Sequence, residues 1–323
     1  MIYINCDSTD AKFNFALETY AMHELDISDE YFMFWRTSPT LMVGRFQNTL
    51  SEINMRYAKE HDINIVRRIT GGGTIYTDLN GWQFSFIVKR RGSIEFKTFT
   101  QPIIDALASL GIEAQLTGRN DLTIGGRKFS GNAQYIGRDF TLHHGSILFD
   151  TDLEALVRAL SVDDEKIVSK GIKSVRQRVT NVSEHLKKRM TSVEFRDAML
   201  SHLLRGADTY ELSKADIDRI SEIKQSKFDT WEWNFGSSPK FNVTKEKRFA
   251  GGKLCAKVLV EKGRIAAIKF FGDFFAAEGI EDLEKALAGC RYEYSDIKNA
   301  LIAACAGDFI YNITTDEILS CII

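Results

Sequence analysis

The chain has 323 residues and a mass of 36.6 kDa, a size that suggests one large domain and a smaller one. Hydrophobic residues make up 44% and charged residues 27%, which is typical of a folded globular protein and argues against long disordered stretches. The 42 Lys and Arg residues nearly balance the 44 Asp and Glu residues, which disfavours a protein that coats nucleic acid through bulk positive charge.

The cysteines and the first residues bear on the cellular compartment. Five cysteines, at positions 6, 255, 290, 305 and 321, form no CxxC pair and show no zinc-binding spacing. Their odd number argues against an oxidised framework, so we expect a protein of the reducing cytoplasm. The N-terminus lacks the segments of a signal peptide, and no apolar run approaches the roughly 18 residues that span a bilayer, so we expect no membrane association.

Hydrophobic periodicity predicts alternating helices and strands. A helix is expected over residues 10–25, with Asp10 as its N-cap. Strands are expected at 31–36, 40–45, 63–68, 73–77 and 82–89, with a polar helix over 50–60. A helix over 94–110, starting at Ser93, then precedes two hairpins that turn at Gly125-Gly126 and Gly137-Arg138. Further helices are expected over 152–160 and 192–205.

A domain boundary is predicted near residues 237–250, where a Gly-Ser-Ser-Pro stretch is followed by a basic one. We therefore expect a large domain over residues 1–244 and a small one over 245–323. The small domain combines a hairpin pattern, 253–260 and 264–271, with helices near 281–289 and 295–305, which is typical of an α+β module.

The first candidate site is the stretch Arg67-Arg68-Ile69-Thr70-Gly71-Gly72-Gly73-Thr74. Three consecutive glycines at a strand end allow a ligand to approach the backbone amides closely. The two arginines at the same strand end offer planar donors for a carboxylate or a phosphate. The alternative interpretation is a flexible connector with a solvated basic pair. A P-loop is excluded, because no Gly-Lys-Ser/Thr follows at the required spacing.

The second candidate site is the stretch 120–133. A tight Gly-Gly turn would bring Asn120 and Asp121 close to Lys128 on the returning strand. Asn120 and Asp121 offer hard oxygen ligands for Mg²⁺, and Lys128 supplies a point charge for phosphate or carboxylate. The small residues at 130–133 leave room for a ligand beside the lysine. A plain surface hairpin is the alternative interpretation.

Two further segments carry chemistry-bearing residues. Because neighbouring strand residues point to opposite faces, we expect one of His143 and His144 to point outward and the other to pack through a hydrogen bond, which disfavours a metal site. The segment from Lys170 to Asn181 is basic and glycine-punctuated. It is interpreted either as a solvated loop or as a mobile loop over an anionic ligand.

In this order, the segments resemble the lipoate-protein ligases. The family carries an RRxxGGG stretch, here Arg67 to Gly73, and an Asn-Asp pair followed by G-x-K-x-x-G-x-A, here ending at Ala133. It also carries His-His-Gly before an apolar strand and a K-G-I-x-S-V-R-x-R-V-x-N loop, here starting at Lys170. Trp35-Arg36, Val43 to Asn48 and Trp231 to Gly236 are similar to family stretches as well, so the resemblance covers about residues 1–240.

The resemblance implies an α/β (α+β) catalytic domain similar to biotin ligases and class II aminoacyl-tRNA synthetases, with a mixed sheet flanked by helices, plus a small α+β C-terminal domain. It also implies that ATP activates lipoate as lipoyl-AMP, which a lysine of a lipoyl domain then attacks. The acceptors would be acyltransferase subunits of 2-oxoacid dehydrogenases or the glycine-cleavage H protein. ATP and Mg²⁺ would be required, without nucleic acid or membrane, and the enzyme would be a monomer.

The family pattern also implies individual roles. Lys128 would be the catalytic residue, and Asp121 would be the Mg²⁺ ligand. Thr77 stands where relatives usually have histidine, and we expect it to replace that residue through a neutral hydrogen bond. Lipoate and its adenylate would contact Trp35, Arg68, Gly71, Gly72, Gly73, Lys128, Gly131, Ala133, His144 and Gly145. ATP would contact Arg68, Thr74, Ile75, Tyr76, Thr77, Asn120 and Lys128.

Other functions compete with this interpretation. Octanoyl- and lipoyl-transferases share the fold but use a nucleophilic cysteine close before the lysine motif, and residues 94–133 contain none. A non-catalytic protein that binds lipoyl carriers is the alternative from a different class. Loss of Lys128 or of the glycines would favour it, and all of them are present. A biotin ligase orders its basic Gly-rich loop differently.

Overall fold

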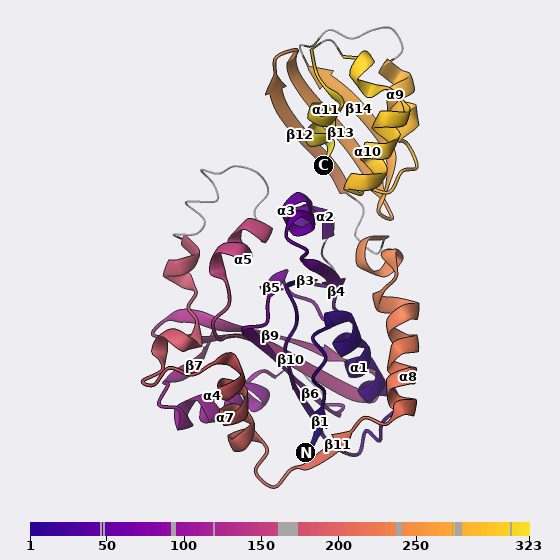
Figure 1. Ribbon diagram of the computed structural model, residues 1–323. Coiled ribbons are helices and arrows are strands. Elements are labelled where there is room, and N and C mark those ends of the chain that lie inside the picture. The colour runs from indigo at the N-terminus through magenta and orange to yellow at the C-terminus, as the bar shows by residue number, and fades with distance from the viewer. Residues whose placement is uncertain are drawn as a thin grey trace. The chain divides into compact units, whose positions relative to one another are not determined.

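The computed structural model describes residues 1–45, 47, 49–91, 95–118, 120–160, 174–236, 241–272, 274, 280–310 and 312–323. Ser93, where a helix was expected to start, and the first part of the basic segment, residues 170–173, lie outside this described part. The chain divides into two compact units (Figure 1). The first comprises Met1–Gln47 and Glu52–Thr230, and the second comprises Asn48–Ser51 and Trp231–Ile323.

An eight-stranded mixed sheet forms the centre of the first unit. Its strands are β1 (Ile2–Asn5), β2 (Tyr31–Trp35), β6 (Gly81–Lys89), β7 (Ala114–Thr117), β8 (Asp121–Ile124), β9 (Arg127–Ile136), β10 (Phe140–Leu148) and β11 (Asp208–Glu211). Their spatial order is β11-β1-β2-β6-β10-β9-β8-β7. β1 pairs in parallel with β11 and β2, and the remaining neighbours pair antiparallel.

Helices cover both faces of this sheet. α1 (Ala11–His23) packs with α8 (Lys214–Ile223), and α4 (Lys97–Ser109) packs with α7 (Ser192–Leu203) (Figure 1). The aromatic core lies under α4 and α7, where Phe84, Phe99 and Phe195 are buried. The central strands β6 and β10 are almost entirely buried, because helices and neighbouring strands cover them on all sides. The mixed sheet flanked by helices that the family resemblance implied is confirmed.

A smaller three-stranded sheet in the same unit carries the glycine stretch. It consists of β3 (Thr40–Val43), β4 (Asn64–Arg67) and β5 (Ile75–Thr77), with β3 in the middle. α3 (Met55–Glu60) and α5 (Leu153–Leu160) pack on it. The single helix expected over 50–60 is wrong: the segment divides into α2 (Thr49–Glu52) and α3, because Asn54 is extended and accepts a hydrogen bond from the Tyr57 amide as an N-cap.

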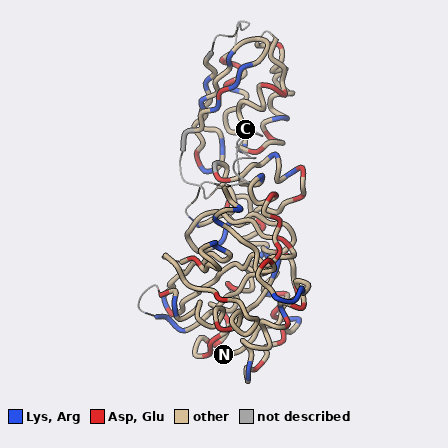
Figure 2. The backbone as a smooth tube through the Cα atoms, turned by 90° about the vertical axis from the view of Figure 1, so that its left-hand side faces the viewer, with Lys and Arg blue, Asp and Glu red and all other residues tan. Residues whose placement is uncertain are grey.

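The second unit is a three-stranded antiparallel sheet with helices packed against one face. Its strands are β12 (Phe241–Phe249), β13 (Gly252–Glu261) and β14 (Arg264–Gly272), and its helices are α9 (Ile280–Leu287), α10 (Tyr294–Ala303) and α11 (Thr315–Ile322). The predicted hairpin is confirmed, with Lys262 and Gly263 both at positive φ in its turn. Figure 2 shows that Lys and Arg, and Asp and Glu, are distributed along the backbone of both units.

The predicted hairpins of the first unit are also confirmed. Gly125 and Gly126 have φ values of 55° and 77°, which is the backbone of a type I′ turn between β8 and β9. Hydrophobic periodicity did not predict β1 and β11, because four residues are too few to show a period. It did not predict the polar helix α8 either. Of the described helices, none is long and apolar enough to cross a membrane, and all five cysteines are free thiols.

A buried hydrogen bond between Tyr20 and Asp216 joins α1 to α8. The Tyr20 hydroxyl donates to Asp216 Oδ1 at 2.5 Å, and the Tyr210 hydroxyl donates to Oδ2 at 3.2 Å in a less buried position. We expect Tyr20→Phe to lower the free energy of unfolding by about 1–3 kcal/mol, because it removes a donor from a buried carboxylate. Urea denaturation measures the loss. Tyr210→Phe is the matched control with a smaller loss, and equal losses would contradict this account.

Candidate active site

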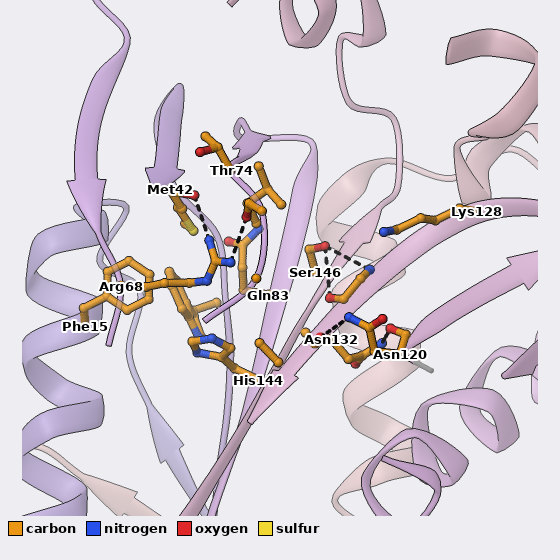
Figure 3. Close-up of a pocket in the computed structure, with 17 residues that line it drawn as sticks. Phe15, Met42, Arg68, Thr74, Gln83, Asn120, Lys128, Asn132, His144 and Ser146 are labelled. Carbon is orange, nitrogen blue, oxygen red and sulfur yellow. Dashed lines mark hydrogen bonds between the residues drawn. The ribbon is translucent and has the colours of Figure 1, made fainter. Parts of the chain in front are cut away.

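A cavity of about 170 Å³ lies in the first unit, where its two sheets and α1 contribute side chains. Figure 3 shows Phe15, Met42 and Arg68 on one side of it and Asn120 and Lys128 on the other. Aromatic and aliphatic walls thus stand at one end, and amide and ammonium groups stand at the other. The lining residues are Phe15, Trp35, Met42, Arg68, Gly72, Gly73, Thr74, Ile75, Gln83, Asn120, Lys128, Gly131, Asn132, Ala133, His144, Gly145 and Ser146.

The glycine stretch is folded around the side chain of Arg68, which is 5% exposed. Its guanidinium donates to the carbonyl oxygens of Met42, Gly71 and Gly73, each at 2.8 Å, and to Thr70 Oγ1 at 3.1 Å. Burial lowers the pKa of Arg68 to about 10, so the group remains a cation at neutral pH. Arg68 therefore fixes the loop with its hydrogen bonds and contributes its charge to the cavity wall.

Arg67 does not share this role, and the expectation that both arginines offer donors to a ligand is wrong for it. Its side chain is completely buried, and Nη1 donates to the carbonyl oxygens of Gly44, Arg45 and Gln47 at 2.9, 3.0 and 2.7 Å. Successive residues of a strand point in opposite directions, so Arg67 enters the protein on the side away from Arg68. It holds the loop after β3, which packs against the glycines.

Lys128 and Asp121 meet across the predicted hairpin. Lys128 Nζ lies 2.7 Å from Asp121 Oδ1, and both side chains are partly exposed. A β-bulge at Leu122/Thr123 sets this register. A Cβ on Gly131 would lie 3.1 Å from Lys128 Nζ, so the glycine leaves space for the lysine. The Lys128 carbonyl accepts a hydrogen bond from the Thr180 amide at 2.9 Å, which joins the described end of the basic segment to the site.

Asn120, just before β8, and Asn132 on β9 are joined by two hydrogen bonds at the cavity wall. Asn120 Nδ2 donates to the Asn132 carbonyl at 2.7 Å, and Asn132 Nδ2 donates to the Asn120 carbonyl at 3.1 Å. Beside them, Gly145 has no room for a side chain, because a Cβ there would lie 2.3 Å from Asn132 Oδ1. The small residues at these positions therefore serve packing between β9 and β10 as well as access to the cavity.

Both histidines of β10 are buried, so the expectation that one points outward is wrong. The cause is that β10 is a central strand whose two faces are covered. His143 stacks on Phe99 with ring centroids 4.9 Å apart, and its Nδ1 and Nε2 contact Gln134 and Asn132. His144 faces the cavity instead, where Nε2 lies 2.7 Å from Thr70 Oγ1.

A buried carboxylate stands behind the cavity. Glu18 on α1 is fully buried, and its Oε1 lies 3.1 Å from His144 Nδ1 and accepts a hydrogen bond from Ser85 at 2.6 Å. Ser85 Oγ in turn accepts a hydrogen bond from Trp35 Nε1 at 2.9 Å. The negative charge of Glu18 also favours the charged form of Arg68. Glu18 thus orients an aromatic and an imidazole side chain of the cavity while compensating a buried cation.

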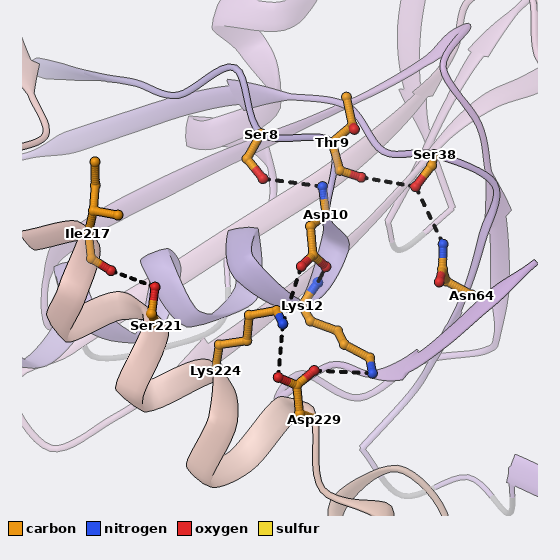
Figure 4. A network of polar contacts seen from close by, with 10 residues as sticks. All are labelled: Ser8, Thr9, Asp10, Lys12, Ser38, Asn64, Ile217, Ser221, Lys224 and Asp229. Carbon is orange, nitrogen blue, oxygen red and sulfur yellow. Dashed lines mark hydrogen bonds and ion pairs between the residues drawn. The ribbon is translucent and has the colours of Figure 1, made fainter.

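The N-terminus of α1 is held by a polar cluster that positions this helix (Figure 4). Asp10 caps the helix by accepting a hydrogen bond from the Lys12 amide, as the sequence predicted. Asp229 lies between two lysines, 3.3 Å from Lys12 Nζ and 2.8 Å from Lys224 Nζ. Phe15, one turn further along α1, packs on Trp35 and reaches the cavity.

Most of the sequence-predicted site residues line the cavity, but four do not. Gly71 gives its carbonyl to Arg68, and Asp121 pairs with Lys128. Tyr76 is buried in the small core around β3. Thr77 is 2% exposed, and its hydroxyl accepts a hydrogen bond from Gln83 at 2.7 Å, so it supports a lining residue instead of facing the cavity.

Sequence reasoning missed several lining residues, namely Phe15, Met42, Gln83, Asn132 and Ser146, together with the buried Glu18. They lie on α1, β3, β6, β9 and β10, which are far apart in the chain. The sequence offered one local signal for Glu18, namely a charged residue on an otherwise apolar helical face. A charged residue is rarely buried without a partner, so its position indicated a polar partner inside the protein.

The chain matches family models over most of its length: the lipoyl protein ligase A/B catalytic domain over residues 10–204 and the bacterial lipoate protein ligase C-terminus over residues 238–322. It is 41% identical over 330 residues to lipoate-protein ligase LplJ of Bacillus subtilis, covering 100% of both chains. It is 40% identical to lipoate-protein ligase 1 of Staphylococcus aureus, covering 92% of each.

Solved structures agree. A bi-partite lipoate protein ligase from Thermoplasma acidophilum superposes with a TM-score of 0.66 at 26% identity, covering 75% of this chain and 98% of that chain. A lipoate-protein ligase A bound with ATP has the same fold, with a TM-score of 0.64 at 24% identity, covering 73% of this chain and 98% of that one. The fold and the matched models define a ligase enzyme. The chain belongs to the lipoate-protein ligase family, and the predicted resemblance is confirmed.

His143 generates a prediction on pH-dependent stability. Burial, with the nearby His144 as a smaller contribution, lowers the pKa of His143 to about 3, whereas an exposed histidine titrates near 6.5. Below pH 6.5 the unfolded chain therefore binds a proton that the folded protein does not. We expect the free energy of unfolding to fall as pH is lowered from 6.5 towards 3, by up to about 1.4 kcal/mol per pH unit from this group.

Urea denaturation between pH 4.5 and 7.5 measures this slope. The variant His143→Gln keeps a hydrogen-bonding side chain but does not titrate, so its profile should be flatter than that of the unchanged protein. His61→Gln is the matched control, because His61 is the exposed C-cap residue of α3. Parallel profiles for His143→Gln and the unchanged protein would refute the assignment.

Proposed function

We propose that this protein activates lipoate with ATP as lipoyl-AMP and transfers the lipoyl group to a lysine of a lipoyl domain. Its membership of the lipoate-protein ligase family over the full length supports this proposal, together with a cavity that has aromatic and aliphatic residues beside Arg68 on one side and Lys128 on the other. The acceptors would be acyltransferase subunits of 2-oxoacid dehydrogenases or the glycine-cleavage H protein. The enzyme would act in the cytoplasm as a monomer.

The apolar end of the cavity suits the lipoyl chain. Phe15, Trp35, Met42 and Ile75 form its walls, and Phe15 packs edge-on against Trp35 with ring centroids 5.5 Å apart. Burying an alkyl chain there contributes about 0.8 kcal/mol for each CH₂ group. The carboxylate at the head of the chain would then lie towards Lys128, where the nucleotide must meet it.

Lys128 is suited to the chemistry because its ammonium group is partly exposed on a flexible side chain and forms one ion pair, with Asp121. A carboxylate oxygen of lipoate attacks the α-phosphorus of ATP, and the bond to the pyrophosphate oxygen breaks. The ammonium of Lys128 offsets the repulsion between the two anions and the charge that develops on the α-phosphate. In the second step the amine of the acceptor lysine attacks the acyl carbonyl, loses its proton, and AMP leaves. Lys128 would compensate the departing phosphate there as well.

Asp121 is the residue that fits a metal ion at this end. Mg²⁺ in nucleotide sites commonly takes one or two carboxylates together with the substrate phosphates. Asp121 is partly exposed and pairs only with Lys128 among the described residues, so its oxygens become available when Lys128 turns to the nucleotide. There Mg²⁺ would supply further neutralisation of the triphosphate charge.

The positions of the cysteines support a ligase over an acyl transferase. None of the five cysteines is among the residues that line the cavity in the described part of the chain. The lining of the cavity therefore offers no thiol for a covalent acyl-enzyme beside Lys128. Direct use of an adenylate needs no such group.

The central prediction concerns Lys128. Lys128→Met retains the side-chain stem and removes the charge, so we expect turnover to fall by ~10²-fold or more, the scale of losing one preorganised electrostatic donor. Lipoate-dependent exchange of pyrophosphate into ATP measures the first step, and lipoylation of a purified lipoyl domain measures the whole reaction.

The matched control is Arg127→Met. Arg127 is the neighbouring cation in the same strand, but its side chain contacts Glu184 at 3.4 Å and does not line the cavity. We expect its activity to remain close to normal. Near-normal lipoylation by Lys128→Met would refute the assignment of the cavity.

Gly73 allows a clean test of the glycine loop as a ligand surface. A Cβ on Gly73 would meet no atom within 4 Å, whereas one on Gly72 would lie 2.9 Å from Arg68 Nη2 at a φ of 95°. We expect Gly73→Val to raise the Michaelis constants for lipoate or ATP roughly tenfold, because the new side chain would occupy space in the cavity that a ligand needs. The melting temperature should not fall, because that side chain would clash with no protein atom. Gly72→Val should lower both affinity and stability. Unchanged kinetics for Gly73→Val would contradict a ligand at this loop.

A further inference from the structure

One lining residue of the cavity carries a polar atom that the fold leaves without a partner. Gln83 is 4% exposed, and its amide nitrogen donates to the Thr77 hydroxyl at 2.7 Å. The amide oxygen is buried and has no hydrogen-bond partner in the described part of the chain. Such an atom destabilises a fold, and most buried polar atoms are paired. A ligand in the cavity is therefore the natural partner of this amide.

Several other donors of the cavity wall are already bonded to protein acceptors. The guanidinium of Arg68 donates to three carbonyl oxygens and a hydroxyl. The indole nitrogen of Trp35 donates to a serine hydroxyl at 2.9 Å, and the Thr74 hydroxyl donates to a glutamine oxygen at 2.9 Å. These groups shape the wall, whereas part of the Gln83 amide is free to bind a ligand.

Gln83 lies between the aromatic side of the cavity and Lys128 (Figure 3). On β6 it stands directly opposite Trp35 of β2 and directly opposite Ser146 of β10. Side chains in such pairs share a face of the sheet, with Cβ atoms about 5 Å apart. On the next strand, the Gly131 amide donates to Ser146 Oγ at 3.4 Å, and a Cβ on Gly131 would lie 3.1 Å from Lys128 Nζ. Gln83 is thus located where an acyl chain beside Trp35 would end in its carboxylate.

The chemistry of lipoate decides which end of the amide faces it. A hydroxyl both donates and accepts, so Thr77 can bond either end of the Gln83 amide. A half-turn of the amide places its oxygen on Thr77, which then donates to it, and turns the NH₂ group to the cavity. Lipoate in its disulfide form has no N–H or O–H group once its carboxyl is ionised, and its carboxylate only accepts hydrogen bonds. The half-turned amide therefore fits this ligand.

We propose that Gln83 is a catalytic residue, whose NH₂ group donates a hydrogen bond to the acyl oxygen that stays on the lipoyl group. The inference rests on the proposed function, which supplies that acyl group. When one carboxylate oxygen attacks the α-phosphorus and pyrophosphate leaves, the other oxygen becomes the carbonyl oxygen of lipoyl-AMP. Gln83 holds this oxygen and so fixes the direction of the attacking one.

The same hydrogen bond stabilises the second step. When the acceptor amine attacks the carbonyl carbon, the electron pair of the C=O double bond moves to the oxygen that Gln83 contacts. The pair returns as AMP leaves, and the amine loses its proton. A donor at the developing oxyanion lowers the barrier of such a step. Gln83 thus acts on the acyl oxygen, whereas Lys128 acts on the phosphate.

The test is the transfer step of the full-length enzyme, started with lipoyl-AMP and a purified unlipoylated lipoyl domain. Gln83→Met keeps the length of the side chain and removes the amide. We expect transfer at saturating lipoyl-AMP to slow by ~10²-fold, the scale of losing one oxyanion donor. The melting temperature should be unchanged or higher, because an apolar group replaces a buried oxygen without a partner. A purely structural residue would not combine these two results.

Gln83→Glu distinguishes a donor from an acceptor at this position. The carboxylate keeps the shape of the side chain and accepts from Thr77, but it presents an oxygen to the acyl oxygen. At pH 8 we therefore expect it to transfer more slowly than Gln83→Met. The infrared carbonyl stretch of bound lipoyl-AMP, labelled with ¹³C at that carbonyl, should rise in frequency in both variants, because the hydrogen bond is lost. This readout is taken on the folded complex, so it remains decisive where a variant is less stable.

Two further variants test positioning and specificity. Thr77→Val removes the hydroxyl that orients the amide, so we expect roughly fivefold slower transfer. Combined with Gln83→Met it should cause no further loss, because both changes act through one hydrogen bond. The matched control is Gln115→Met, on the exposed edge strand β7 of the same sheet and outside the cavity lining. Its transfer rate should stay normal.

Two results would overturn the inference. One is a normal transfer rate and an unshifted carbonyl stretch in Gln83→Met. The other is transfer by Gln83→Glu at or above the rate of the unchanged enzyme, which would show that the amide accepts a hydrogen bond from the ligand. Failure of the proposed function is distinguishable, because the unchanged enzyme would then show neither lipoate-dependent pyrophosphate exchange nor transfer from lipoyl-AMP.

Discussion

The arrangement of the candidate site depends on one buried cation, the guanidinium of Arg68. Removing such a group from water costs several kcal/mol unless its donors are satisfied. Here three carbonyl oxygens and a hydroxyl satisfy them, and the buried carboxylate of Glu18 compensates the charge. Because these carbonyls come from β3 and from the glycine loop, the requirement for hydrogen bonds determines the path of that loop. The cavity wall follows from that path.

The two cations of the cavity consequently have different physical roles. Arg68 is nearly buried, and its hydrogen bonds to three backbone carbonyls and the Thr70 hydroxyl hold its positive charge in one place. Lys128 is partly exposed and makes one ion pair on a flexible stem, so it can follow charge as it moves between substrates. Small residues around both, such as Gly73 and Gly131, leave the space in which a ligand can approach them.

In the second unit, too, neighbouring side chains differ in burial. Leu254, Ala256, Val258 and Val260 of β13 are buried in the core, whereas Lys257 between them is exposed. On the other face, Phe271 is 51% exposed and Lys257 Nζ lies 5.2 Å from the centre of its ring.

The amino-acid sequence was enough to identify the glycine loop and the hairpin that brings Asp121 to Lys128, because both rest on turn chemistry and local motifs. The same motifs carried the resemblance to the family, and the helix-flanked mixed sheet was expected from that resemblance. The packing of distant elements was needed to show that Arg67 is buried away from the cavity, that both His143 and His144 are buried, and that Glu18 lies behind the site. Local pattern shows which residues share a strand or a helix, but not which face is covered. Burial and partners depend on elements far apart in the chain, so the directions of these side chains were settled only by packing.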